Sequence, residues 1–353
     1  MIVIMLSEAC APVDRRRIID TVQFAGTGLR VHTPALLSLS GDHKKIAALL
    51  ADEPCVLDVA KLPAAYPRSA RLKGRPRTTP VPLGNADVGE DFTVIAGPCS
   101  VENRSQLLTI AGAVKAAGAH ALRAGAFKPR TSPYSFHGLG VPGLRLLAEA
   151  RELTGLPVVT EVVDVRDIEV VAEHVDMIQI GARNMQNYTL LREAGRTRVP
   201  VLMKRGLSAS VDETLLASEY LLDGGNEQVV LCERGIRTFE SSYRFTLDLG
   251  AVAVLKERTH LPVIVDPSHA AGASGRVVPL ALAAAAVGAD GIIVESHHDP
   301  AAALCDGAQA LPVGDLPDLM SRLVHACTAA GRSLRFETGD QVRGGGLLDR
   351  VHS

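Results

Sequence analysis

The sequence lacks the features that would assign it to several common functional classes. Neither sign of charge prevails, because 37 Lys and Arg stand against 39 Asp and Glu, for a formal net charge of −2. Such a balance gives no global attraction to nucleic acid or to an acidic membrane surface. No apolar run approaches the roughly 18 residues of a membrane helix, and the apolar start at Met1–Leu6 has no basic leader. We therefore expect neither a membrane span nor a signal peptide.

Paired cysteines and nucleotide-binding loops are also missing. The six cysteines are Cys10, Cys55, Cys99, Cys232, Cys305 and Cys327. They show neither zinc-type pairs nor the spacing of a disulfide framework, which favours a reducing, cytoplasmic location. No G-x-G-x-x-G motif follows the first strand of the barrel predicted below, and no Walker-type loop is present. Dinucleotide binding and phosphate capture by a Gly-rich cradle are therefore disfavoured.

The length and the N-terminal pattern indicate more than one domain. At 353 residues and 47 % hydrophobic composition, the chain can form a barrel of about 250 residues and a small extra domain. Residues 1–62 alternate as β, α, β, β, α, β, which is typical of a ferredoxin-like unit. The basic stretch around Pro63, Pro67 and Pro76 has linker composition, and we interpret it as solvated. The expected parts are a ferredoxin-like, candidate regulatory domain with its linker (1–75), a catalytic barrel (76–336) and a polar tail (337–353).

Eight short apolar runs recur at the spacing of a strand, a loop and a helix, and each ends in a charged or metal-binding residue. This pattern predicts an α/β fold, a (β/α)₈ TIM barrel, rather than an open doubly wound sheet. The predicted strands are 93–96, 119–123, 157–161, 177–180, 200–204, 228–233, 262–266 and 291–295. Helical patterns between them include 105–117, 144–154, 211–223 and 278–287. A hairpin within 81–93 is expected to close the bottom of the barrel.

Four side chains suited to metal binding occur at the first and last strands. Cys99 follows strand one, Glu295 ends strand eight, and His269 and Asp306 follow strands seven and eight. Strands one and eight are neighbours in a closed barrel, so these side chains are expected to meet. Their mixture suits Mn²⁺, Fe²⁺, Zn²⁺ or Co²⁺ better than Mg²⁺ or Ca²⁺, and Mn²⁺ is our first candidate. Each residue alone has an ordinary structural explanation, so the prediction rests on their coincidence.

Basic residues gather at the other strand ends. They are Arg123, Lys128, Arg130, Arg183, Lys204, Arg205 and Arg234. Burying such groups is costly unless an anion faces them, so their convergence favours a substrate with phosphate and carboxylate groups. The alternative is that some pair with Glu161, Glu233 or Asp266 inside the barrel mouth. From the residues alone, the function is metal-dependent chemistry on a small phosphorylated acid.

The strand ends also carry a family resemblance over about residues 93–330. The chain resembles class I 3-deoxy-D-arabino-heptulosonate 7-phosphate (DAHP) synthases, and the β-type branch fits best because its members can carry an N-terminal ferredoxin-like domain. The matching segments are Ala96–Glu102 (AGPCSVE), Arg123–Pro133 (RAGAFKPRTSP), Gln179–Asn184 (QIGARN), Lys204–Gly206 (KRG), Cys232–Gly235 (CERG), Asp266–His269 (DPSH) and Ile293–Glu295 (IVE). In combination these motifs are highly specific.

The resemblance implies the first step of the shikimate pathway, in which phosphoenolpyruvate and erythrose 4-phosphate condense with water to give DAHP and phosphate. It also implies that Cys99, His269, Glu295 and Asp306 ligate the metal. The residues implied to hold phosphoenolpyruvate are Arg123, Lys128, Arg183, Lys204 and Arg234, and those implied to receive the aldose phosphate are Arg130, Thr131 and Ser132.

For Lys128, Glu161 and Asp266 the sequence allows two roles, namely proton transfer or a purely electrostatic contribution to binding and orientation. Lys128 is a candidate proton donor or shuttle, since neighbouring cations would lower the pKa of its ammonium, but simple charge binding explains it equally well. Glu161 and Asp266 would either orient the basic groups or move protons.

Two other functions and one regulatory role are also considered. 3-Deoxy-D-manno-octulosonate 8-phosphate synthases share the barrel and the chemistry but take arabinose 5-phosphate, and the stretch Lys128–Ser132 (KPRTS) favours the four-carbon sugar. A catalytically silent binding barrel is disfavoured by the intact metal and basic sets. Family likeness further suggests a homotetramer, and an N-terminal domain that binds Tyr or Phe as an effector.

Overall fold

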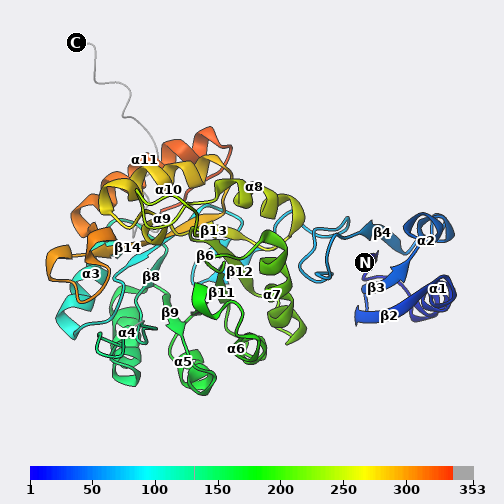
Figure 1. Cartoon of the computed structure of the whole chain (residues 1–353), viewed down its shortest axis with the longest axis horizontal. Helices are drawn as coiled ribbons and strands as arrows, with labels where there is room; N and C mark the ends of the chain where they lie inside the picture. The colour runs from blue at the N-terminus through cyan, green and yellow to red at the C-terminus, as the bar shows by residue number, and fades with distance from the viewer. Residues whose placement is uncertain (131, 337–353) are drawn as a thin grey trace, which may run out of the picture.

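The N-terminal residues form a four-stranded antiparallel sheet with two helices. The computed structural model describes residues 1–130 and 132–336, so the predicted tail 337–353 lies outside the described residues. The elements are β1 (Ile2–Leu6), α1 (Pro12–Ala25), β2 (Gly26–Thr33), β3 (Leu36–Gly41), α2 (His43–Leu49) and β4 (Val56–Lys61). The strand order β2-β3-β1-β4 confirms the ferredoxin-like prediction. Figure 1 shows this unit, in dark blue, to one side of the larger body.

The connection after β4 is packed against the barrel, although the sequence suggested a solvated linker. Tyr66 and Ala70 are buried. The Glu219 carboxylate accepts hydrogen bonds from the backbone N–H groups of Arg68 (3.2 Å) and Ser69 (2.7 Å). Lys73 and Arg77 stay exposed. The solvated-linker interpretation is therefore wrong for part of this segment, because buried apolar residues alternate with the exposed charges.

His260 anchors the same segment. Its Nδ1 lies 2.8 Å from Thr79 Oγ1, and its Nε2 lies 2.8 Å from the Arg68 carbonyl and 2.5 Å from Arg75 Nη1. Burial, with a smaller contribution from Arg75, lowers the pKa of His260 to about 4. The imidazole is therefore neutral in the folded protein at neutral pH.

We predict that His260 makes the protein less stable in mild acid. The unfolded chain takes up a proton near pH 6.5 and the folded protein only near pH 4, so stability is complete above about 6.5 and falls as the pH is lowered. Between pH 7 and pH 5 the loss is on the order of 2 kcal/mol. Urea unfolding at both pH values should show that His260→Gln, which cannot titrate, loses less stability than the wild type. Equal losses would contradict the prediction.

Eight parallel strands form the closed barrel that the sequence predicts. They are β7 (Thr93–Gly97), β8 (Ala121–Arg123), β9 (Val158–Val162), β10 (Met177–Ile180), β11 (Val201–Lys204), β12 (Val229–Glu233), β13 (Val263–Val265) and β14 (Gly291–His297). Each pairs with the next, and β14 pairs with β7 to close the ring. The strands are buried on both faces, which explains why they read as nearly continuous apolar runs. Beyond Asp306, the short β15 (Leu311–Pro312) pairs with the end of β14.

Helices surround this ring (Figure 1). They are α3 (Arg104–Ala116), α4 (Val141–Thr154), α5 (Ile168–Ala172), α6 (Tyr188–Ala194), α7 (Val211–Asp223), α8 (Leu249–Arg258), α10 (Val277–Ala286) and α11 (Leu316–Ala329). The short α9 (Pro267–Ala271) follows β13 directly. Local signals fix the helix starts: at α7 the Ser210 hydroxyl caps the Glu213 N–H, and the Glu213 carboxylate accepts from the Ser210 N–H. None of the helices in the described residues is long and apolar enough to cross a membrane.

A hairpin closes one end of the barrel, as predicted. It consists of β5 (Val81–Leu83) and β6 (Ala86–Val88). Its apolar side chains pack with interior residues of the strands, including Ile95 and Leu202. The functional residues predicted above lie at the opposite end, where the strands terminate, which is the face that carries active sites in this architecture.

Candidate active site

The structure brings the predicted metal-binding side chains together between β7 and β14. Cys99 Sγ, a Glu295 carboxylate oxygen and an Asp306 carboxylate oxygen all lie within 4.8 Å of one another. His269 Nε2 completes the group, 3.4 Å from Glu295 Oε1 and 4.0 Å from Asp306 Oδ2. Pairing of β7 with β14 places residues from the two ends of the barrel sequence next to each other.

His269 is oriented from behind by Asp266. Asp266 caps α9, since its Oδ1 accepts a hydrogen bond from the His269 N–H at 2.9 Å, and its Oδ2 lies 2.7 Å from His269 Nδ1. Lys204 Nζ donates to the same Oδ2 at 2.5 Å. Although burial opposes ionisation, His269 and Lys204 hold the pKa of Asp266 well below its ordinary value. The ionised Asp266 therefore leaves Nε2 as the free nitrogen that faces the donor group.

The chemistry of this group fits a divalent cation. Glu295 is fully buried, and its Oε1 accepts no hydrogen bond from the described residues, although Arg123 Nη2 lies 3.2 Å away. Burial works against the charge of Asp306, but His269 and Arg244 lower its pKa to about 2. Two ionised carboxylates, a thiol and a neutral imidazole nitrogen thus share one small volume, and this donor set suits a transition metal.

A cavity of about 310 Å³ opens beside the donor group. Ten of the predicted residues line it, namely Arg123, Lys128, Arg130, Ser132, Glu161, Arg183, Lys204, Arg234, His269 and Asp306. Thr131 lies outside the described residues. The cavity is therefore strongly basic, and it is also lined by His269 and Asp306 of the predicted metal-binding group.

Two buried guanidinium groups have donors without partners among the described residues. Arg123 Nε and Nη1 and Arg234 Nη1 make no hydrogen bond there. The Arg234 guanidinium also stacks on the Phe245 ring, 4.3 Å from its centroid. Buried donors of this kind are costly unless an anion satisfies them. The cavity is thus suited to a ligand with several negative charges.

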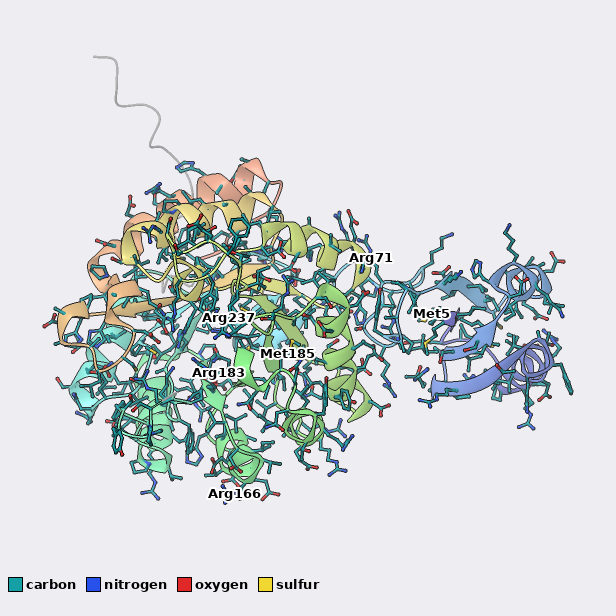
Figure 2. All side chains as sticks on the ribbon, viewed as in Figure 1. Met5, Arg71, Arg166, Arg183, Met185 and Arg237 are labelled. Carbon is teal, nitrogen blue, oxygen red and sulfur yellow. The ribbon has the colours of Figure 1, made fainter. Side chains whose placement is uncertain are left out.

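Arg183 and Arg205 occupy different surroundings from these two. Arg183 is exposed at the cavity rim, and Figure 2 labels it among the barrel elements, far from Met5 of the N-terminal sheet. Arg205 does not line the cavity, because its Nη1 pairs with Glu233 (2.8 Å) and Asp248 (2.9 Å). The alternative raised from the sequence, a salt bridge in the barrel mouth, therefore describes Arg205. It also describes Lys204, which lines the cavity but pairs with Asp266 at 2.5 Å.

The expectation that cations lower the pKa of Lys128 is wrong for this structure. Burial and the neighbouring Arg123 do act in that direction, but Cys99, Glu161 and Glu295 outweigh them and raise the pKa above its ordinary value. Lys128 therefore stays protonated and contributes a fixed positive charge to the cavity.

The structure adds cavity residues that sequence reasoning missed. They include Gln179, Leu207, Arg244 and Phe245. Gln179 lies inside a strand, and Arg244 and Phe245 lie in a long segment between β12 and α8, so these three do not stand at a strand end. Leu207 does follow the end of β11, but its apolar side chain carries no charge or metal-binding group. The QIGARN motif does mark one requirement: a Cβ at Gly181 would overlap the Glu161 carboxylate, so any other residue would displace that side chain from its place in the cavity.

The fold and this site together define a TIM-barrel enzyme whose cavity suits a small anionic substrate and lies beside side chains that suit a metal ion. A sequence profile of the DAHP synthetase I family matches residues 79–329, and the chain belongs to that family.

Individual relatives agree with the profile. The chain is 45 % identical over 298 residues to a phospho-2-dehydro-3-deoxyheptonate aldolase of Thermotoga maritima, covering 84 % of this chain and 88 % of the relative. A 2-dehydro-3-deoxyphosphooctonate aldolase of Geobacter sulfurreducens is 32 % identical, covering 70 % and 97 %. The crystal structure of the Thermotoga maritima DAHP synthase superposes with a TM-score of 0.75 at 38 % identity, covering 95 % of this chain and 99 % of that one.

Proposed function

We propose that this chain is a DAHP synthase that condenses phosphoenolpyruvate with erythrose 4-phosphate and water, releasing phosphate. The observation that carries the proposal is the continuity of the site: His269 and Asp306 of the metal-binding group line the same cavity as Arg123, Lys128 and Arg234. One substrate therefore lies against the basic side chains while its partner reaches the metal-binding group. Family membership supports the same reaction.

The buried cations fix phosphoenolpyruvate. Its carboxylate and phosphate satisfy the free donors of Arg123 and Arg234, with Lys204 and Arg183 completing the charge balance. Holding both anionic groups turns a chance encounter into a near-attack geometry, with C3 directed at the incoming aldehyde. Arg130 and Ser132 lie toward the opening and receive the phosphate of the sugar.

Cys99, His269, Glu295 and Asp306 would hold the divalent cation. When bound, the cation supplies polarisation of the aldehyde carbonyl. C3 of phosphoenolpyruvate forms the new bond, water adds at C2, and the resulting hemiketal phosphate loses phosphate by C–O cleavage. Lys128, charged and buried, stabilises negative charge that develops between the two substrates. Mn²⁺ is the first candidate ion, with Fe²⁺, Co²⁺ and Zn²⁺ as alternatives.

Phosphoenolpyruvate consumption by chelator-stripped enzyme tests the reaction. We expect turnover with erythrose 4-phosphate only after Mn²⁺ is added, and none with arabinose 5-phosphate. Turnover with the five-carbon sugar would assign the chain to the 3-deoxy-D-manno-octulosonate 8-phosphate reaction, whose named relatives are also similar to it. No turnover with either sugar, while phosphoenolpyruvate still binds, would favour the silent barrel.

The N-terminal unit is proposed to regulate the barrel. Its ferredoxin-like sheet is joined to the barrel by a packed segment, so a ligand on the sheet has a physical path to the catalytic body. The proposed effector is Tyr or Phe, and the proposed assembly is a homotetramer in the cytoplasm. The proposed division of the chain is 1–75, 76–336 and 337–353.

We predict that deleting residues 1–62, which removes the ferredoxin-like sheet but keeps the segment packed against Glu219 and His260, abolishes inhibition by about millimolar Tyr or Phe while turnover remains. A truncated form of the Thermotoga maritima enzyme has been solved and superposes on 77 % of this chain with a TM-score of 0.72, which supports an independent barrel. Initial rates with and without each amino acid measure the effect, and circular dichroism checks that the truncated chain is folded. A full-length enzyme that neither amino acid inhibits would remove the proposal.

A further inference from the structure

One glutamine lies behind the metal-binding group and touches none of the substrate cavity. Gln309 is 2 % exposed. Its Nε2 donates to Glu295 Oε2 at 2.5 Å, and its Oε1 accepts from Arg244 Nη1 at 2.6 Å. The same Arg244 Nη1 donates to Asp306 Oδ1 at 3.2 Å. One amide and one guanidinium therefore connect the two carboxylates.

The two oxygens of each carboxylate, Glu295 and Asp306, lie in different surroundings. Glu295 Oε2 is held by Gln309, while its Oε1 has no hydrogen bond within the described chain and lies 3.4 Å from His269 Nε2. Asp306 Oδ1 is held by Arg244, while its Oδ2 faces Cys99 Sγ at 3.2 Å. Each carboxylate thus has one oxygen tied away from the group and one turned into it.

The backbone fixes this arrangement. Asp306 adopts φ +53°, which places it in the left-handed region that non-glycine residues seldom occupy. Gly307 follows because a Cβ there would lie 2.2 Å from the Pro300 carbonyl oxygen. The Gln309 N–H donates to the Asp306 carbonyl at 3.2 Å, and β15 then attaches the segment to β14. A strained turn therefore carries both the Asp306 carboxylate and Gln309, whose amide holds the Glu295 carboxylate in place.

We propose that Gln309 and Arg244 are positioning residues that preorganise Glu295 and Asp306 for a divalent cation. The proposal deepens the proposed function and rests on its metal site. Glutamine suits the task because its amide donates to a carboxylate and accepts from a guanidinium at once. Without these bonds the two carboxylates are free to rotate their inward oxygens away, and the bound cation loses ligands.

Mn²⁺ titration of the chelator-stripped, full-length protein without substrate tests the proposal, with free Mn²⁺ followed by electron paramagnetic resonance. We expect Gln309→Met, which keeps length but removes both polar atoms, to raise the Mn²⁺ Kd by roughly 10–100-fold. Arg244→Met should also raise the Mn²⁺ Kd. The matched control is Asn226→Leu, which removes a buried amide with two hydrogen bonds at the opposite end of the barrel. Its Mn²⁺ Kd should equal that of the wild type even if its stability falls.

A folded Gln309→Met protein with wild-type Mn²⁺ affinity overturns the proposal. If Gln309→Met does not fold, Arg244→Met decides, because the Arg244 side chain is 35 % exposed and its loss leaves the core intact; wild-type affinity there overturns the proposal as well. A wild-type enzyme that binds Mn²⁺ but condenses neither sugar refutes the proposed reaction and leaves the positioning role standing. A wild-type enzyme that turns over without binding Mn²⁺ refutes both the metal site and the positioning role.

Discussion

Replacing Cys99 by Ala is expected to abolish metal-dependent turnover while the protein stays folded. Cys99 Sγ lies 3.2 Å from Asp306 Oδ2 and within the group formed with Glu295. Removing it takes away a proposed direct ligand of the metal, so the loss should exceed the roughly 10–100-fold that loss of an outer partner costs. The side chain is small and the barrel core does not depend on it. Mn²⁺ titration and phosphoenolpyruvate consumption measure the two effects.

Cys327→Ala is the matched control for this change. Cys327 is also a buried free thiol, but it lies on α11, away from the donor group. Its replacement should leave Mn²⁺ affinity and turnover as in the wild type. Equal activity of Cys99→Ala and Cys327→Ala would remove Cys99 from the metal site.

Asp266→Asn should cost both stability and activity. Lys204 Nζ and His269 Nδ1 both direct hydrogens at Asp266 Oδ2, and an asparagine N–H₂ in that place offers a donor where an acceptor is required. Lys204 would be left as an uncompensated buried charge, which typically costs about 3–5 kcal/mol. His269 would also lose the acceptor that orients its ring, so kcat should fall even at saturating Mn²⁺. Urea unfolding and steady-state kinetics separate the two losses.

A double variant distinguishes charge burial from catalysis. In Lys204→Met with Asp266→Asn, both buried charges are gone, so the loss of unfolding free energy should be smaller than the sum of the single losses. Turnover should not recover, because His269 remains unsupported and the cavity has lost a cation. Additive stability losses would show that the pair is not coupled as the 2.5 Å contact implies.

The barrel and its site could be predicted because both follow from one regularity. Parallel strands buried on both faces are apolar until they end, so Arg123, Lys204 and Glu295 stand out as the first charged residue after each run. Closure of the ring brings the first and last strands together, so the sequence pattern also predicts that Cys99 lies beside Glu295.

The features that could not be predicted depend on side-chain partners rather than on position. Arg205 stands at a strand end like Lys204, yet its guanidinium turns toward Glu233 and Asp248. The pKa of Lys128 depends on the balance of the charges around it, and Cys99, Glu161 and Glu295 together outweigh Arg123. Gln309 carries a neutral, unreactive amide that no sequence pattern singles out, and its proposed role follows only from its contacts with Glu295 and Arg244.

The pairing of β7 with β14 also has a consequence for biosynthesis. Thr93 and Gly291 are partners in that ladder, so nearly the whole barrel must leave the ribosome before the ring can close. Glu295 and Asp306 emerge last, and until they do Cys99 has no carboxylate beside it. The growing chain therefore cannot bring Cys99, His269, Glu295 and Asp306 together until Asp306 has been synthesised. Because the contacts that close the ring join residues so distant in sequence, we expect closure to be a slow, late step of folding. Metal capture would then report that synthesis has reached the final strand.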